Sequence, residues 1–329
     1  MTEFRRRDLI RLAVAAAAGW PPRAPAQRRS SRGIGYLDMG FQNPVSTALV
    51  AAFRRGLGEQ AHDEQSARLS LAWAEFSFDR LLDFAADLAH GSIDMIVAAG
   101  PLPALAARSA TAKIPIVFVL AGDPVALNLV RSLERPGGDI TGVILPSTEL
   151  VRRRLEQLHE ISPAAGLTGF LVNSTAPETK TRIAEGVAAA RSLGIHLVIL
   201  DATIPNQIER AFETLQRQRL GALMVDDDPL FLEECATVSS LAAKFRVPAM
   251  YAYREAVDAG GLMSFGAKAA DAWRLAGISA GRILGGDDPA QLPVRQVNRL
   301  ERVINLKTAK ALGIELPDAI LSQADAVIR

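Results

Sequence analysis

The chain has 329 residues, of which 37 are basic, 36 are acidic and 49% are hydrophobic. Without residues 1–26, 32 basic residues stand against 34 acidic ones, a net charge of −2. This balance excludes the basic surface that binding to nucleic acid or to an anionic membrane requires. Cys235 is the only cysteine, which excludes an intrachain disulfide. Roughly 300 remaining residues predict two domains of ordinary size, stabilised by buried apolar area.

The N-terminal stretch RRRDLIRLAVAAAAGWPPRAPAQ (5–27) has the order of a secretory signal peptide: basic residues, an apolar run and the triplet Ala24-Pro25-Ala26. The apolar run, 12–20, is far shorter than the ~20 residues of a spanning helix. Two consecutive prolines after it would end a core helix. We therefore predict a signal peptide over 1–26, cleaved after the triplet, and a periplasmic protein that is not inserted in the membrane. The pair Arg6-Arg7 resembles a twin-arginine export signal.

Short apolar runs alternate with helical patterns along the rest of the chain. In the first half, strands are predicted at 33–37, 69–73, 95–99, 114–120 and 141–145, and helices at 46–58, 79–90, 103–111, 124–133 and 149–161. In the second half, strands are predicted at 168–173, 197–202, 222–226 and 248–253, each followed by a helical pattern. Uninterrupted apolar strands between helices indicate parallel sheets covered on both faces. The predicted fold class is α/β, with two doubly wound, Rossmann-like lobes and with Cys235 in a core helix.

Polar or small residues follow the strands of both series, at the carboxyl ends where such sheets bind ligands. In the first series they are 38–44, Gly100-Pro101 and Gly122-Asp123-Pro124; in the second they are 173–175, Asp201, 226–229 and 251–253. Each of these residues can also be explained as a helix cap, and that alternative stays open for any single one. Their repetition predicts two facing rims of a cleft.

Enzyme and metal motifs are incomplete. Gly33-Ile34-Gly35 begins a strand instead of following one, and Asp38 occupies the third glycine position of a dinucleotide fingerprint. The stretch 261–268 misses the spacing of a phosphate loop by one residue, and no Gly-x-Ser-x-Gly elbow surrounds Ser264. The histidines are scattered, and the consecutive Asp226–Asp228 do not readily converge on one ion. We predict no catalytic site, no cofactor and no metal, and thus a binding protein that is not an enzyme.

Five stretches together resemble the substrate-binding proteins of ABC transporters, in the family that includes tryptophan-binding lipoproteins. They are IPIVFVLAGDPVALNLV (114–130), RPGGDITGV (135–143), REAVDAGGLMSFG (254–266), AGISAGRILGG (276–286) and RVINLKTAKALGIELP (302–317). The resemblance implies a type I periplasmic binding protein, with two lobes joined by a three-crossing hinge. Such a protein closes on a small ligand and delivers it to an ABC permease and, through it, to an ATPase. We expect a monomer.

The hinge crossings are predicted near residues 146, 262 and 294, with RPGGD (135–139) and DAGG (258–261) as nearby markers. The N-terminal lobe would then comprise 27–145 plus 262–293, and the C-terminal lobe 146–261 plus 294–329.

By position, the resemblance implies a ligand site built from the loop after the first strand and from the later strand ends. The candidate ligand-binding residues are Met39, Phe41, Gln42, Asn43, Gly100, Pro101, Asp123, Asn173, Ser174, Asp226, Asp228, Tyr251, Tyr253 and Ser264. Three departures from the family pattern bear on the ligand. Pro101 stands where many relatives have a hydroxyl residue, Asp226-Asp227 where Gly-Ala is common, and Phe265 where tyrosine is common.

Asp123 and Asp226–Asp228 are expected to face each other across the cleft, where unpaired carboxylates would favour a ligand with an ammonium group. Backbone N–H groups at the helix starts after Gly100 or Asn173 are placed to hold a ligand carboxylate. The predicted ligand is amino-acid-like, zwitterionic or cationic. The alternative that these aspartates only cap helices stays open.

Proteins with this fold also serve as sensors and as transcription regulators. A sensor that presents its ligand to a kinase or chemoreceptor stays open, because nothing within the chain separates it from a transport protein. We do not expect a transcription regulator, because the segment before Gly33 is short for a DNA-binding domain and has the wrong composition.

Overall fold

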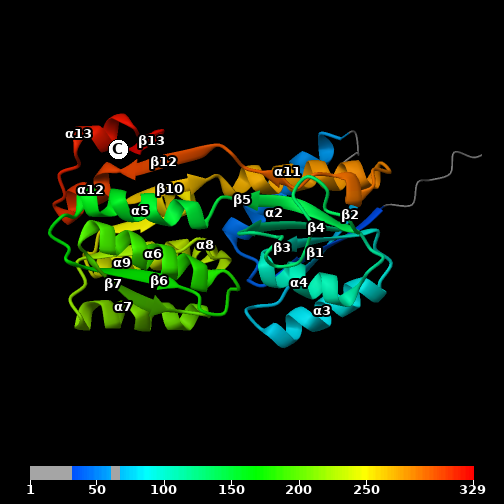
Figure 1. The fold of residues 1–329 in the computed structure, drawn as a ribbon, viewed down its shortest axis with the longest axis horizontal. Helices are drawn as coiled ribbons and strands as arrows, with labels where there is room; N and C mark the ends of the chain where they lie inside the picture. Colours follow the sequence, from blue (N-terminus) through cyan, green and yellow to red (C-terminus); the bar gives the residue numbers. More distant parts are fainter. Residues whose placement is uncertain (1–31, 61–66) are drawn as a thin grey trace, which may run out of the picture. The chain divides into compact units, whose positions relative to one another are not determined.

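The computed structural model describes residues 32–60 and 67–329. The predicted signal peptide, with its paired arginines and its cleavage site, lies outside the described residues. Figure 1 shows two groups of strands, one containing β1 to β5 and the other β6 to β10, each with helices packed around it. The prediction of two parallel-sheet α/β lobes is confirmed. None of the helices in the described part of the chain is long and apolar enough to cross a membrane.

The first lobe has a six-stranded parallel sheet in the order β11-β5-β4-β3-β1-β2. Its strands are β1 (Arg32–Asp38), β2 (Ala67–Trp73), β3 (Met95–Ala99), β4 (Ile116–Ala121), β5 (Ile140–Leu145) and β11 (Arg295–Gln296). Its helices are α2 (Pro44–Gly58), α3 (Phe78–His90), α4 (Pro101–Ala110), α11 (Ala269–Leu284) and the short η2 (Pro289–Gln291). Helices α2 and α11 bury one face of the sheet, and α3 and α4 bury the other.

The second lobe has a seven-stranded sheet in the order β13-β12-β10-β9-β8-β6-β7, in which β12 runs antiparallel to β10. Its strands are β6 (Leu167–Val172), β7 (His196–Asp201), β8 (Ala222–Val225), β9 (Ala249–Tyr251), β10 (Met263–Ala267), β12 (Leu300–Asn305) and β13 (Ala326–Ile328). Its helices are α5 (Thr148–Ile161), α6 (Thr179–Leu193), η1 (Pro205–Gln207), α7 (Ile208–Arg217), α8 (Pro229–Glu233), α9 (Cys235–Lys244), α10 (Arg254–Asp258), α12 (Leu306–Leu312) and α13 (Asp318–Ser322).

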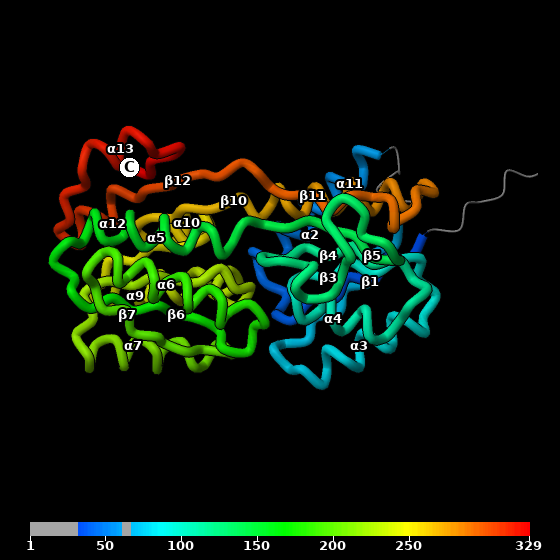
Figure 2. The backbone as a smooth tube through the Cα atoms, viewed as in Figure 1, coloured from blue at the N-terminus to red at the C-terminus, as the bar shows by residue number. Residues whose placement is uncertain are grey.

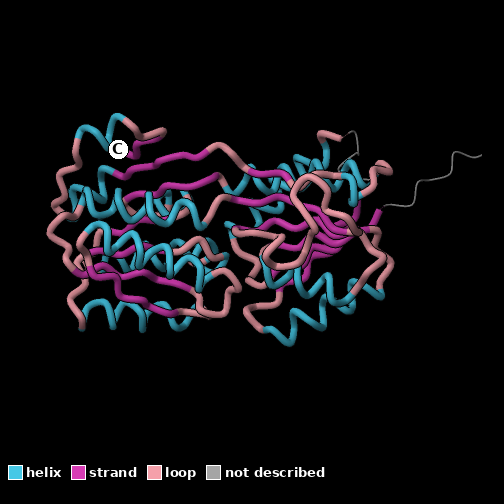
Figure 3. The backbone as a smooth tube through the Cα atoms, in the orientation of Figure 1, coloured by secondary structure: helices cyan, strands magenta, loops and turns pink. Residues whose placement is uncertain are grey.

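Helices cover both faces of this second sheet as well, as Figure 3 shows for the helices drawn in cyan around the magenta strands. α5 and α6 pack on one face, and α7 and α9 pack on the other. Cys235 is buried at the start of α9, which confirms its predicted place in the core. In both lobes the helices cover the faces of the sheet, and loops follow the carboxyl ends of the parallel strands.

The chain passes between the lobes three times, from β5 to α5, from β10 to α11 and from β11 to β12 (Figure 2). The crossings predicted near 262 and 294 are too early. β10 pairs with β9 and β12, so the chain leaves the second lobe only after Ala267. β11 pairs with β5, so the final crossing follows Gln296. The glycine-rich stretches at 135–139 and 258–261 each precede one more strand, β5 or β10, before the chain crosses.

The prediction of a helix at 124–133 is wrong. The chain makes one turn there, in which the Leu129 N–H donates to the Pro124 carbonyl at 2.9 Å. Asn128 has a φ of 54°, in the left-handed region where a right-handed helix cannot continue. The helix-like apolar spacing arises because Leu129 and Val130 are buried against the first lobe.

Candidate functional site

A cavity lies between the lobes, at the carboxyl ends of both sets of strands. It contains about 560 Å³ of empty space, part of it open to solvent. The first lobe contributes Asp38, Leu49, Ala99, Gly100, Pro101, Val119, Leu120, Ala121, Leu145 and Trp273, and the second contributes Ala176, Glu178, Arg182, Asp227, Asp228, Pro229, Leu232, Glu233 and Tyr253. Doubly wound sheets bind ligands at these strand ends, so both walls lie where a site is expected.

A second space of about 420 Å³ adjoins the first and shares Gly100, Pro101 and Asp228 with it. Phe76 from the first lobe and Asn173 from the second are among the other residues that line it. We call the two spaces together the cleft.

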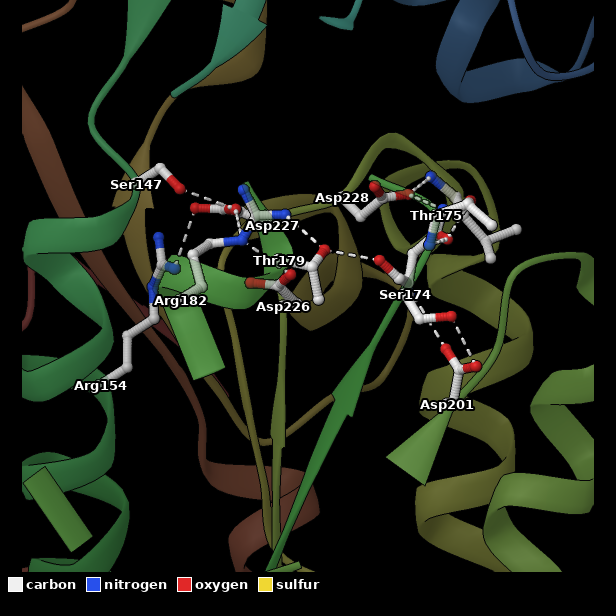
Figure 4. A network of polar contacts seen from close by, with 12 residues as sticks. Ser147, Arg154, Ser174, Thr175, Thr179, Arg182, Asp201, Asp226, Asp227 and Asp228 are labelled. Carbon is white, nitrogen blue, oxygen red and sulfur yellow. Dashed lines mark hydrogen bonds and ion pairs between the residues drawn. The ribbon is translucent and has the colours of Figure 1, made fainter. Parts of the chain in front are cut away.

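The first two of the three aspartates after β8 are paired with arginines (Figure 4). Asp226 Oδ2 lies 2.9 Å from Arg182 Nε, and Asp227 lies 3.2 Å from Arg154 Nη1 and 3.6 Å from Arg182 Nε. All four side chains are at most 3% exposed. Burial raises the pKa of Asp226, and the Arg182 charge opposes that rise, so the ion pair favours the charged form. The expectation of unpaired carboxylates is therefore wrong for these two residues.

The two arginines were not among the predicted site residues, although the sequence contains a signal for them. Arg154 and Arg182 occupy positions that helical periodicity assigns to the buried faces of α5 and α6. An arginine on such a face needs a buried anionic partner. The acidic run after β8 supplies that partner for both helices.

Asp228 caps helix α8 and also lines the cavity. Its Oδ1 accepts hydrogen bonds from the Leu230 N–H at 2.9 Å and from the Asn173 side-chain amide at 3.1 Å. Asn173 Oδ1 in turn accepts from the backbone and the hydroxyl of Thr175. Burial raises the pKa of Asp228, and the Asn173 amide opposes that rise.

Glu178 precedes α6, and its carboxylate reaches the first lobe. A Cβ atom placed on Gly122 would lie 2.6 Å from Glu178 Oε1. Both carboxylate oxygens are buried, and neither has a hydrogen-bond partner among the described residues. Burial raises the pKa of Glu178, while the neighbouring Arg182 lowers it. A buried carboxylate of this kind requires a donor, which a bound ligand can supply.

A second carboxyl contact joins the lobes, between Asp38 at the end of β1 and Glu233 at the end of α8. The Phe41 N–H donates to Glu233 Oε2 at 2.9 Å, and Asp38 Oδ1 accepts from the Gly40 N–H at 3.0 Å. Burial raises the pKa of Asp38 to about 6. Burial and the Asp38 charge raise the pKa of Glu233 to about 9. Two carboxylates this close repel each other, so the pair favours the state in which one of the two groups holds a proton.

Six of the predicted site residues line the cleft: Met39, Gly100, Pro101, Asn173, Asp228 and Tyr253. The Tyr253 hydroxyl donates to the Asp227 carbonyl at 2.8 Å. Phe41 packs against the cleft residue Phe76, with ring centroids 5.5 Å apart. Asn43 caps α2, since its side chain accepts from the Ser46 N–H.

The other predicted site residues lie outside the lining of the cleft. Tyr251 is buried in the core beside α7 and α9, because its side chain lies on the face of the sheet that these helices cover. Ser174 faces solvent and donates to Asp201. Three more are the exposed Gln42, the ion-paired Asp226 and the buried Ser264, and the last is Asp123. In residues 32–60 and 67–329, no group of His, Cys, Asp and Glu side chains is placed to hold a metal ion.

Asp123 is exposed and accepts a hydrogen bond from the Val125 N–H at 2.8 Å, so it caps a turn and does not face Asp226 across a cavity. We expect Asp123→Asn to leave ligand affinity within about twofold of wild type, as for other surface substitutions. Isothermal titration calorimetry measures this. A much larger loss of affinity would restore Asp123 as a ligand contact.

Comparisons with known proteins agree with this geometry. The chain is 24% identical over 292 residues to a tyrosine-binding protein of Clostridioides difficile, a match that covers 88% of this chain and 83% of the relative. It also matches the structure of an ABC domain from Streptococcus pneumoniae in complex with L-Trp. That match has a TM-score of 0.82 at 25% identity and covers 91% of this chain and 100% of the other.

The arrangement of the lobes can be judged from a third relative. The ligand-free, open structure of a substrate-binding protein with adhesive properties from Clostridium difficile gives a TM-score of 0.62, also at 25% identity. That match covers 90% of this chain and 99% of the other. Because the identity is the same as for the L-Trp complex and the coverage differs by one per cent, the lower score indicates a different arrangement of the lobes. The hydrogen bond from Phe41 to Glu233 across the cleft agrees with a closed form.

The family model of ABC transporter substrate binding proteins matches residues 42–328, nearly the whole of the described chain. The match includes both sheets except β1, and the lining of the cleft except Asp38 and Met39. The chain therefore belongs to the family of ABC transporter substrate-binding proteins.

Proposed function

We propose that the protein binds an aromatic amino acid in the cleft, by closure of the two lobes, and delivers it to an ABC permease. The observation that carries this proposal is an apolar cavity, built by both lobes and lined by a buried carboxylate that has no hydrogen-bond partner among the described residues. We further propose that the chain is exported to the periplasm through its N-terminal segment and works as a monomer.

The ammonium group of the ligand is assigned to Glu178. Its two oxygens are buried without donors, whereas Asp226 and Asp227 are neutralised by arginines and Asp228 already accepts two hydrogen bonds. A charge-assisted hydrogen bond from an ammonium group satisfies such oxygens better than a neutral donor does. An anionic ligand such as a sugar phosphate would add further negative charge beside Asp38 and Asp228.

The apolar part of the ligand is assigned to the wall of the first cavity. The Trp273 ring lies there with Leu49, Leu145 and Leu232, and the Tyr253 ring adds a second aromatic surface. The Trp273 indole N–H is already bonded to the Tyr36 hydroxyl at 3.0 Å, so the ring is held in place before a ligand arrives. Aromatic rings gain from offset or edge-to-face contact with one another, beyond their buried area.

Fewer donors face a ligand carboxylate than the sequence led us to expect. Pro101 and Pro103 have no N–H, so Leu102 is the free donor in the first turn of α4. The N–H groups of Ser174 and Thr175 are already bonded to Asp201 and Asn173. The Arg182 guanidinium, which lines the cavity, is the remaining cationic donor within the described residues of its wall.

A panel of matched ligands tests the proposal. L-tryptophan, L-tyrosine and L-phenylalanine are compared with indole-3-propionate, which lacks the ammonium group, and with tryptamine, which lacks the carboxylate. At about a hundred times its dissociation constant, a true ligand stabilises the fold by ~2.7 kcal/mol in a thermal-shift assay. We expect tryptamine to retain more of the affinity of L-tryptophan than indole-3-propionate does. Equal binding of L-tryptophan and indole-3-propionate would contradict the assignment of Glu178, and no response to any amino acid would contradict the proposed ligand class.

A further inference from the structure

Glu233 of the second lobe contacts the first lobe directly, and the binding of a ligand does not require this contact. It lies at the end of α8 in the second lobe, and its carboxyl group covers Gly40 in the first. A Cβ atom at Gly40 would overlap that carboxyl group, so the contact depends on glycine at this position. The Phe41 N–H fixes one carboxyl oxygen of Glu233 at 2.9 Å.

Asp38, on the other side of this contact, is held in a network of donors. Its Oδ1 accepts from the Gly40 N–H at 3.0 Å, and its Oδ2 accepts from the Tyr36 hydroxyl at 3.2 Å. The Tyr36 hydroxyl accepts in turn from the Trp273 indole N–H at 3.0 Å. These donors favour the carboxylate form of Asp38. Two carboxyl groups in contact are stable together when one of them carries a proton, and the donors around Asp38 favour the proton on Glu233.

We propose that Asp38 and Glu233 form a proton-dependent clasp between the lobes, so that closure takes up one proton and becomes weaker as the pH rises. This inference rests on the proposed closure of the lobes around a ligand. It adds that the chain's own carboxyl groups, independently of the ligand's chemistry, make that closure sensitive to pH.

Among the described residues, no cation is paired with the carboxyl groups of Asp38 and Glu233. The titratable groups that face Glu233 are Asp38 and Tyr36 from β1 and Glu234 next to it, and Glu234 acts to raise the pKa of Glu233 further. The other charged groups on the cavity wall are Asp227, Asp228, Glu178 and Arg182. Arg182 is ion-paired with Asp226 and Asp227 and is not among the main causes of the shift in the pKa of Glu233.

The direction of the pH dependence follows from the pKa of Glu233 in the two forms. With the lobes apart and Glu233 in water, we expect the ordinary pKa of a glutamate, 4.5, and thus an ionised side chain at neutral pH; burial and the Asp38 charge raise that pKa when the lobes close. At a pH between the pKa values of Glu233 in the open and the closed form, closure takes up one proton, and the dissociation constant rises with pH by up to about tenfold per pH unit. Below about pH 6, Asp38 begins to take up a second proton in the closed form.

Calorimetry with L-tryptophan as the probe tests the clasp. Titrations at pH 7.5 in two buffers of different ionisation enthalpy measure the protons taken up on binding. We expect about one proton for the wild type and for the control Glu234→Gln, which makes the same charge change one residue away. We expect none for Glu233→Gln, whose amide donates to Asp38 but cannot ionise. Binding without proton uptake, or the same uptake in Glu233→Gln, would overturn the proposal.

If L-tryptophan does not bind, the ligand class is wrong but the clasp can still be tested. The radius of gyration of the ligand-free protein is then measured by small-angle scattering at pH 6 and pH 9.5. We expect the wild type and Glu234→Gln to expand at the higher pH, and Glu233→Gln to keep one radius. A wild-type radius that is the same at both pH values would overturn the proposal.

Discussion

Replacing Arg182 with methionine is expected to lower the free energy of unfolding by about 3–5 kcal/mol, because it leaves buried carboxylates without their partner. Asp226 loses its only ion pair within the described residues, and Asp227 retains Arg154. Without the arginine, the pKa of Asp226 rises further in the folded state than burial already raises it. The loss of stability should therefore be larger at pH 8 than at pH 5.5, where Asp226 can be protonated.

Chemical denaturation of two further variants separates this effect from a general loss of packing. Arg191→Met changes an exposed arginine on the same helix and should leave stability nearly unchanged. The double variant Arg182→Met with Asp226→Asn should recover part of the loss, because it removes the unpaired charge as well. If the double variant is as unstable as the single one, the ion pair is not the source of the loss.

Replacing Glu178 with glutamine is expected to weaken the binding of an aromatic amino acid by about 10- to 150-fold. A hydrogen bond to a charged group contributes about 1.5–3 kcal/mol, and the amide keeps the shape of the side chain but removes its charge. Because both Glu178 oxygens lack donors among the described residues, the folded protein should lose little stability. Titration calorimetry gives the affinity, and thermal unfolding without ligand checks the fold.

The matched control is Glu185→Gln, which makes the same charge change on an exposed position of α6. It should bind like the wild type. The ammonium-free analogue indole-3-propionate offers a second comparison, since the Glu178→Gln variant should bind it no more weakly than the wild type does. A variant that loses affinity for L-tryptophan and for indole-3-propionate equally would show that Glu178 shapes the cleft and does not bind the ammonium group.

The order of elements up to β9 was predictable from the sequence alone, except for the helix expected at 124–133. Each of the nine predicted strands occurs, from β1 to β9, because runs of apolar residues bounded by polar ones are a local signal. The location of the site at the carboxyl ends was predictable for the same reason, and Gly100, Asp228 and Tyr253 all line the cleft. The error at 124–133 shows the limit of periodicity, because a single left-handed residue, Asn128, ends the helical turn there.

Only the tertiary structure decided which charges are paired and which line the cavity. Asp226 and Asp228 are two residues apart and look alike in the sequence. In the fold, Arg182 of α6 forms an ion pair with Asp226, whereas Asp228 lines the cavity. Glu178 and Glu233 read as ordinary residues near helix ends, and they become buried because the lobes meet over them. The electrostatic partner of a side chain is set by distances of a few ångströms between residues far apart in the chain, 44 positions for Arg182 and Asp226 and 192 for Phe41 and Glu233. Local sequence patterns do not predict those distances.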